Sequence, residues 1–157
     1  NSALSRRRSG FDSPSDRHFI FNMNALTISL LILCYSLILG IIFAQVLLTA
    51  PVVFKVLDEH NASIFLRKIF PRYYLLLFLI SLISLLISYL FFKNFDVYAS
   101  IVAVCFAFIG YIIIPLTNFA RDRGWDRLFQ WFHNFSVFST FIIMTVSIIQ
   151  IFKLTTL

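Results

Sequence analysis

The chain has 157 residues, of which 60% are hydrophobic and only 13% charged, and its formal net charge is +6. A soluble domain of this length cannot bury so much apolar surface, so the composition excludes an ordinary soluble fold. The basic residues flank apolar runs rather than forming one patch, which argues against nucleic acid as a partner and makes membrane lipids the expected surroundings.

Residues 1–22 are rich in Ser and Arg and contain nothing that could form a core. We therefore expect a disordered N-terminal tail over residues 1–22, followed by one transmembrane domain over residues 23–157. Four apolar runs in that domain each approach the ~20 residues that cross a hydrocarbon core. They predict membrane spans at about 25–48, 72–92, 97–117 and 131–152. Short connections then indicate an all-α, polytopic membrane protein, a four-transmembrane-helix up-down bundle.

Two prolines interrupt the helical pattern near the ends of spans. Pro51 follows the first span and Pro115 lies late in the third, and each is predicted to mark a helix bend because proline removes a backbone donor. Between the first two spans, Asp58 or Asn61 is expected to cap a short helix through Phe70. Pro71 would then stand in the first turn of the second span.

Small residues recur at helical spacing on three spans, and small residues let helices approach closely in lipid. On the first span, Gly40 and Ala44 continue a face begun by Ser29 and Ser36. The third span carries the clearest such face: Ala99, Ala103, Ala107 and Gly110. On the second span the face consists of Ser81, Ser84 and Ser88. We expect all three faces to pack inside the bundle.

A polar face on the fourth span is the candidate functional site. His133, Ser136 and Thr140 share this face with Ser147. Together with Gln45 and Thr49 they could line a polar mouth for a metal, a haem or a small polar solute. The alternative is that His133 is an interfacial histidine bonded to a neighbouring helix or a headgroup. No cofactor is predicted, and the metal-ligand set stays unknown.

Three segments resemble a known family. Thr49-Ala50-Pro51-Val52-Val53-Phe54 and the run from Phe65 to Tyr74 are similar to the first hairpin of an uncharacterised bacterial four-helix membrane family, which shares its domain with the eukaryotic transmembrane protein 205. The segment from His133 to Ser136 resembles that family's histidine-and-serine segment. The resemblance implies a four-span fold with no established reaction. The eukaryotic relative's association with platinum-drug resistance hints at metal or vesicular handling.

The spans contain no Asp, Glu, Lys or Arg at depth, which argues against ion-coupled carriers. We therefore expect a non-enzymatic integral membrane protein, acting alone, as a homo-oligomer, or as an accessory subunit of a larger membrane complex. Two alternatives stay open. One is a metal- or haem-binding redox protein that uses His133. The other is a small solute or ion carrier or channel, with a path between the serine face of the second span and the polar face of the fourth.

Basic residues predict the orientation, because Lys and Arg accumulate on the cytoplasmic side of a membrane. The loops predicted at 49–71 and 118–130 share one side, and with Arg72 at the start of the second span this side carries seven basic residues: Lys55, Arg67, Lys68, Arg72, Arg121, Arg123 and Arg127. The other side carries Lys93 and Lys153 when the arginines of the tail are left out. We expect a bacterial inner-membrane protein with both loops in the cytoplasm and both termini outside.

Overall fold

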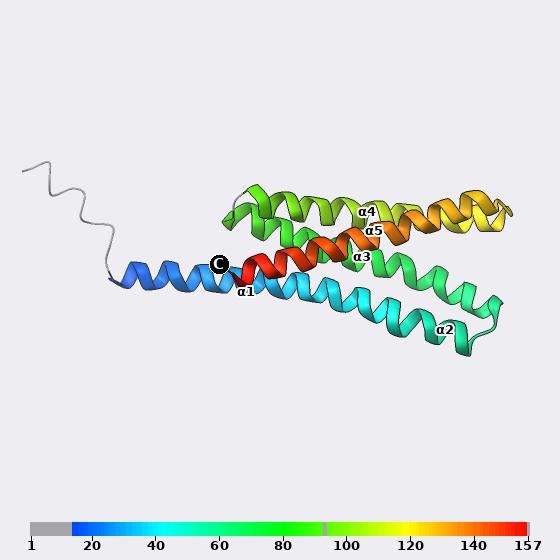
Figure 1. The fold of residues 1–157 in the computed structure, drawn as a ribbon, viewed down its shortest axis with the longest axis horizontal. Helices are drawn as coiled ribbons and strands as arrows, with labels where there is room; N and C mark the ends of the chain where they lie inside the picture. Colours follow the sequence, from blue (N-terminus) through cyan, green and yellow to red (C-terminus); the bar gives the residue numbers. More distant parts are fainter. Residues whose placement is uncertain (1–13, 93, 157) are drawn as a thin grey trace, which may run out of the picture.

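The computed structural model describes residues 14–92 and 94–156, and these form the four antiparallel membrane-length helices of an up-down bundle (Figure 1). The elements in chain order are α1 (Pro14–Phe43), the π-helix η1 (Ala44–Thr49), α2 (Ala50–Val56), α3 (Glu59–Phe91), α4 (Asn94–Asp122) and α5 (Asp126–Thr155). The first crossing consists of α1, η1 and α2 in continuous succession. The chain is therefore an all-α, multi-pass membrane protein.

The helices are longer than the predicted spans. At 33 residues α3 reaches about 50 Å, against a hydrocarbon core of about 30 Å. The predicted loop at 49–71 is mostly helical and turns only at Leu57 and Asp58, and between α4 and α5 only residues 123–125 leave the helix. Hydropathy marks where a helix crosses hydrocarbon, whereas backbone hydrogen bonds continue into the interface. Both loop predictions were therefore too long.

The start of α3 also differs from the prediction. Asp58 caps this helix, and its side chain accepts a 2.7 Å hydrogen bond from the backbone N–H of Asn61. No separate short helix ends at Phe70, because α3 runs on through Pro71, which lies inside it rather than in a first turn. The predicted tail also ends too late. Residues 1–13 lie outside the described residues, whereas residues 14–22 already belong to α1.

The first crossing passes Pro51 through a π-helical turn. Proline lacks the N–H that would bond four residues back, and the wider turn of a π-helix absorbs the mismatch. In η1 the backbone N–H of Ala50 bonds to the carbonyl of Gln45, and the hydroxyl of Thr49 donates to the carbonyl of Ala44 at 3.2 Å. Pro51 therefore marks a change of helix type, and helix continues beyond it to Val56. Pro115 lies inside α4.

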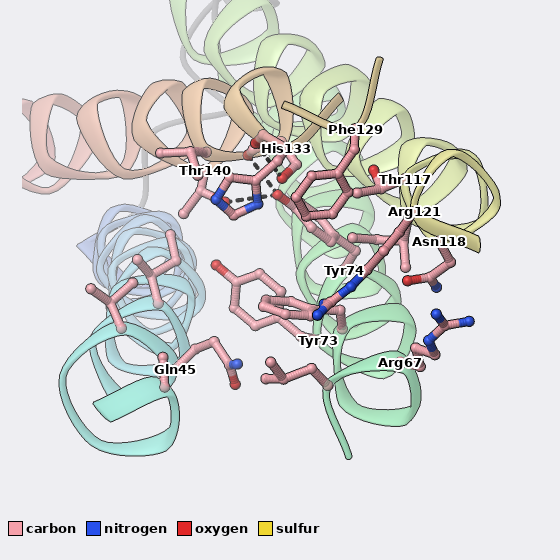
Figure 2. Close-up of a pocket in the computed structure, with 18 of the residues that line it drawn as sticks. Gln45, Arg67, Tyr73, Tyr74, Thr117, Asn118, Arg121, Phe129, His133 and Thr140 are labelled. Atoms are coloured by element: carbon pink, nitrogen blue, oxygen red, sulfur yellow. Dashed lines mark hydrogen bonds between the residues drawn. The ribbon is translucent and has the colours of Figure 1, made fainter. Parts of the chain in front are cut away.

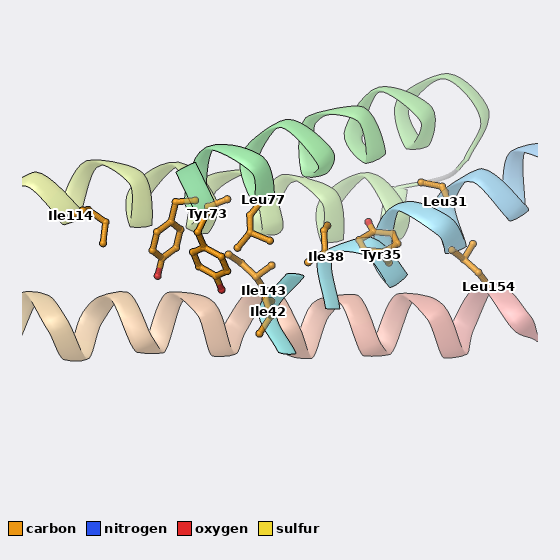
Figure 3. Packing of buried hydrophobic residues seen from close by; sticks show 11 residues of the cluster. Leu31, Tyr35, Ile38, Ile42, Tyr73, Leu77, Ile114, Ile143 and Leu154 are labelled. Atoms are coloured by element: carbon orange, nitrogen blue, oxygen red, sulfur yellow. The ribbon is translucent and has the colours of Figure 1, made fainter. Parts of the chain in front are cut away.

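Small residues on α3 and α4 lie at the centre of the bundle. Ser81, Ser84 and Ser88 are fully buried on α3, and Ala103, Ala107 and Gly110 are buried on α4, while Ala99 is half-buried. Large side chains from α1, α3 and α5 pack around these small residues. Figure 3 shows the resulting core between the helices, with its labelled members: Leu31, Tyr35, Ile38, Ile42, Tyr73, Leu77, Ile114, Ile143 and Leu154.

The packing face predicted on the first span is wrong. Gly40 and Ala44 are exposed, and among the described residues no atom outside the local helix lies within 4 Å of where a Cβ on Gly40 would stand. The buried face of α1 instead carries Tyr35, Ile38 and Ile42. The physical reason is that α1 turns a face of large side chains to the bundle, so Gly40 and Ala44 lie on a different face of the helix.

The bundle is closed at the end that holds the α3–α4 turn. The hydroxyls of Tyr35 and Ser100 are 2.8 Å apart, those of Ser88 and Ser100 are 3.0 Å apart, and both bonds are buried. The ammonium of Lys153 pairs with the buried carboxylate of Asp96 at 2.6 Å. These bonds connect all four helices at this end. Polar groups taken out of water are stable only when they find partners in this way.

Tyr74 gives a direct test of the packing between α3, α4 and α5. A Cβ added at Gly110 would overlap the ring of Tyr74, whose hydroxyl is held on α5. Gly110→Ala should therefore destabilise the protein by about 1–3 kcal/mol through overpacking. The measurement is the midpoint of unfolding in mild detergent.

The matched control is Gly40→Ala, because its methyl group would meet open space. This change should leave the midpoint unchanged or raise it, since alanine favours helix over glycine by about 1 kcal/mol. Equal effects of the two substitutions would contradict the packing described for Gly110.

Candidate functional site

A pocket of about 460 Å³ opens in the half of the bundle that contains η1 and α2 (Figure 2). Its walls come from α1, η1, α2, α3, α4 and α5 and are mainly apolar, for example Ile42, Val46, Phe70, Ile114 and Met144. The volume lies within the range of ~300–1,000 Å³ that is usual for small-molecule sites.

The pocket exists because the first crossing leaves the bundle beyond Phe43. Among the described residues, α1 packs against both α3 and α5, whereas η1 makes no such contact with α3, α4 or α5, and α2 approaches only α3. Figure 1 shows α2 and α5 diverging toward the end that holds both the α2–α3 and the α4–α5 turns. Val46 on η1 and Val137 on α5 both line the pocket and are exposed, so the pocket is open between these two elements.

Two buried polar groups in the pocket wall have no hydrogen-bond partner. The amide nitrogen of Gln45 on η1 and the hydroxyl of Tyr73 on α3 are unpartnered, and both side chains are more than nine-tenths buried. Thr140 lies near Tyr73, but its hydroxyl is bonded to Tyr74 instead. In a membrane an unsatisfied donor costs free energy, so these two groups are suited to a ligand that supplies acceptors.

Ser136 and Thr140, predicted as site residues, serve the bundle itself. The hydroxyl of Tyr74 donates to the backbone carbonyl of Ser136 at 2.7 Å and lies 2.9 Å from the hydroxyl of Thr140. The hydroxyl of Ser136 donates to the backbone carbonyl of His133 at 2.8 Å. Both residues line the pocket, but their hydroxyls already have partners. Thr49 does not line the pocket.

His133 lies at the polar end of the pocket, where its imidazole stacks on Phe129 with the ring centroids 6.0 Å apart. Gln45 stands across the pocket on η1, so the structure brings together Gln45, His133, Ser136 and Thr140. In the part of the chain that the structure describes, no three residues of the types His, Cys, Asp and Glu gather as metal ligands would. In this geometry His133 can form a hydrogen bond to a molecule in the pocket.

The sequence analysis did not name two arginines that line the pocket, Arg67 and Arg121. Arg67 forms a two-pronged ion pair with the carboxylate of Asp122, in which one N–O distance is 2.9 Å. The guanidinium of Arg121 lies 3.6 Å from Glu59 and 5.7 Å from the ring centroid of Phe129. Both arginines were assigned to loops. Extending the helical period beyond the apolar runs would have placed them on pocket-facing helices.

A family model described as "Domain of unknown function (DUF4149)" matches residues 33–124 of the chain, which is more than half of its length. The match includes η1, α2, α3 and α4, and thus all the helices around the pocket except α5. No curated protein and no solved structure matches the chain significantly.

The unpartnered polar groups of Gln45 and Tyr73 lead to a prediction about the stability of the protein. Gln45→Leu and Tyr73→Phe each remove an unsatisfied buried polar atom and keep nearly the same shape. Each should therefore raise the free energy of unfolding of the ligand-free protein, by up to about 1–3 kcal/mol, the usual penalty for such an atom. Thr140→Val, which breaks the bond to Tyr74, should lower it.

The measurement is equilibrium unfolding after extensive delipidation in mild detergent. A loss of stability in both Gln45→Leu and Tyr73→Phe would mean that the two polar groups have partners inside the folded chain.

Proposed function

The chain belongs to the DUF4149 family, and from this membership and its pocket we propose that it is a non-enzymatic membrane protein that binds a lipid-type molecule taken up sideways from the bilayer. The observation that carries this proposal is the sideways opening where η1 and α2 leave α5, because it gives the pocket an entrance from the lipid phase.

The composition of the pocket wall supports a ligand of this class. Most of the lining is aliphatic or aromatic and suits a hydrocarbon chain. The unpartnered groups of Gln45 and Tyr73 suit a polar group on the same molecule. A molecule that combines both parts is an amphiphile, and amphiphiles are abundant in the bilayer that surrounds the opening.

The arrangement of the polar groups favours binding over catalysis. The hydroxyl of Ser136 is directed to the backbone carbonyl of His133 and not to its imidazole. A nucleophile activated by a base would need that side-chain bond. The two lining arginines can bind and orient an anion, but arginine does not give up a proton near neutral pH.

We also propose that the end of the bundle with the pocket faces the cytoplasm of a bacterial cell. Support comes from the seven basic residues at this end against Lys93 and Lys153 at the other, with the N-terminal arginines left out of the count. The helices extend past the hydrocarbon at this end, so Arg67 and Arg121 stand at the level of the headgroups.

The binding proposal predicts that blocking the opening prevents loading. Val46 on η1 and Val137 on α5 line the pocket, and each side chain is partly exposed. Val46→Trp and Val137→Trp should each reduce the amount of co-purified lipid by about tenfold, because the indole fills the entrance. Native mass spectrometry of protein purified in mild detergent measures the bound lipid.

Val52→Trp is the control, since Val52 is similarly exposed on α2 but does not line the pocket. A wild-type protein that carries no lipid, or blocked variants that carry as much as the control, would refute the proposal.

Orientation is tested by thiol labelling of the chain expressed in a bacterial inner membrane, in a background without the native cysteines. Lys55→Cys, at an exposed position of α2, should resist an impermeant thiol reagent in intact cells and react after the membrane is opened. Thr156→Cys, exposed at the opposite end, should react in intact cells. The reverse pattern would overturn the orientation.

A further inference from the structure

We infer that the bound molecule is an anionic amphiphile, whose phosphate or carboxylate group is held by Arg121 at the polar end of the pocket. The inference rests on the proposed function and adds the charge class of the ligand to it. Four observations lead to it: the charges of the lining, the state of each arginine, the unpartnered groups and the position of the opening.

The pocket lining is cationic. Its charged residues, Arg67 and Arg121, are both positive, and no Asp or Glu lines the pocket within the described chain. A positive lining with apolar walls concentrates the field and attracts anions.

The two arginines differ in how far they are already neutralised. Arg67 is held by both oxygens of Asp122, which links α3 to α4 and satisfies its charge. The ion pair of Arg121 is a 3.6 Å contact with Glu59, whose side chain is 92% exposed, and such a surface pair contributes little. The guanidinium also lies 5.7 Å from the ring centroid of Phe129, a contact that supplies no counter-ion. Figure 2 shows the side chain of Arg121 on α4 among the residues that line the pocket. Arg121 is therefore the cation available to a ligand.

The neighbouring groups are donors that lack acceptors. The amide nitrogen of Gln45 can only donate, and the hydroxyl of Tyr73 can donate as well. The imidazole of His133 adds a further N–H at the same end. Phosphate and carboxylate are groups of acceptor oxygens, and the planar guanidinium of Arg121 binds either in a two-pronged manner. A cationic ligand would meet repulsion here, and a neutral alcohol would leave most of the donors unused.

The position of the opening indicates a membrane-borne anion rather than one dissolved in water. Arg121 is close to the last turn of α4, at headgroup level, whereas the apolar walls continue toward the middle of the bundle past Ile42 and Met144. A ligand that reaches both regions has a charged head and an apolar chain. Under the proposed orientation this site faces the cytoplasmic leaflet, where anionic lipids create a negative surface.

The experiment compares ligands that differ in head charge, using the full chain purified in a neutral detergent. The probes are a diacyl phosphatidylglycerol, a long-chain fatty acid, a phosphatidylcholine, a diacylglycerol and inorganic phosphate, each titrated and detected by native mass spectrometry. We expect wild-type protein to bind the phosphatidylglycerol or the fatty acid at least about tenfold more tightly than the diacylglycerol, as one charge-assisted pair would provide.

Arg121→Gln should abolish this preference and leave diacylglycerol binding unchanged. Arg123→Gln is the matched control, because Arg123 lies over the ring of Phe119 and does not line the pocket. The Arg123→Gln variant should keep the wild-type preference for anionic amphiphiles. Comparing the two anionic probes distinguishes a phosphodiester from a carboxylate head.

Several results would overturn the inference. Equal binding of charged and uncharged amphiphiles by wild-type protein would refute it while the proposed function stands. An unchanged preference in Arg121→Gln would refute the role of this residue. Binding of inorganic phosphate as tightly as the anionic amphiphiles would refute a membrane-borne ligand. Binding of none of the amphiphiles would instead remove the proposed function itself.

Discussion

Tyr74 is the contact on which the arrangement of the bundle depends. Its ring packs against Gly110 of α4, and its hydroxyl bonds to both the backbone of Ser136 and the side chain of Thr140 on α5. One side chain thus joins α3, α4 and α5 at the level where the first crossing departs. Because α3, α4 and α5 are held together without help from the first crossing, η1 and α2 can diverge from them and leave a pocket. Hydrocarbon provides no partners for polar groups, so the bond to Tyr74 explains why the hydroxyl of Thr140 is stable there. The hydroxyl of Ser136 is satisfied by the backbone carbonyl of His133.

The two ends of the bundle differ in what surrounds their polar residues, although the side-chain amide of Gln150 near the closed end also lacks partners. At the closed end, Tyr35 and Ser88 bond to Ser100, and Lys153 pairs with Asp96, so polar groups connect helices. At the open end, Gln45 and Tyr73 are left without partners. Unsatisfied buried groups are rare in folded proteins and commonly mark a place where another molecule binds. Binding is assigned to the open end because its unpartnered groups line a pocket, whereas Gln150 and Ser81 do not.

The sequence predicted the four crossings because hydropathy measures a requirement that every membrane helix shares. It also predicted the buried serines of α3 and the buried small residues Ala103, Ala107 and Gly110 of α4, since a polar or small face avoids lipid. It failed at Gly40, because periodicity identifies a face but not the neighbour that covers it. Gln45 and His133 were named from their polarity and line the pocket, whereas Tyr73 and Arg121, which also line it, were not named. Which residues line the pocket depends on where the helices separate from one another, and the pattern of a single helix does not show this.

The π-helix also affects how the first crossing compares with related sequences. Its wider turn accommodates more residues than an α-helical turn, so α1 and α2 follow two helical phases that do not continue into each other. A helical wheel drawn without interruption from Ala25 to Val56 therefore assigns the faces of α2 incorrectly. A relative that lacks one residue between positions 44 and 49 would keep both halves helical, yet its α2 would be rotated by about 100° against α1. A deletion in this short stretch would therefore change which face of α2 is turned toward the pocket.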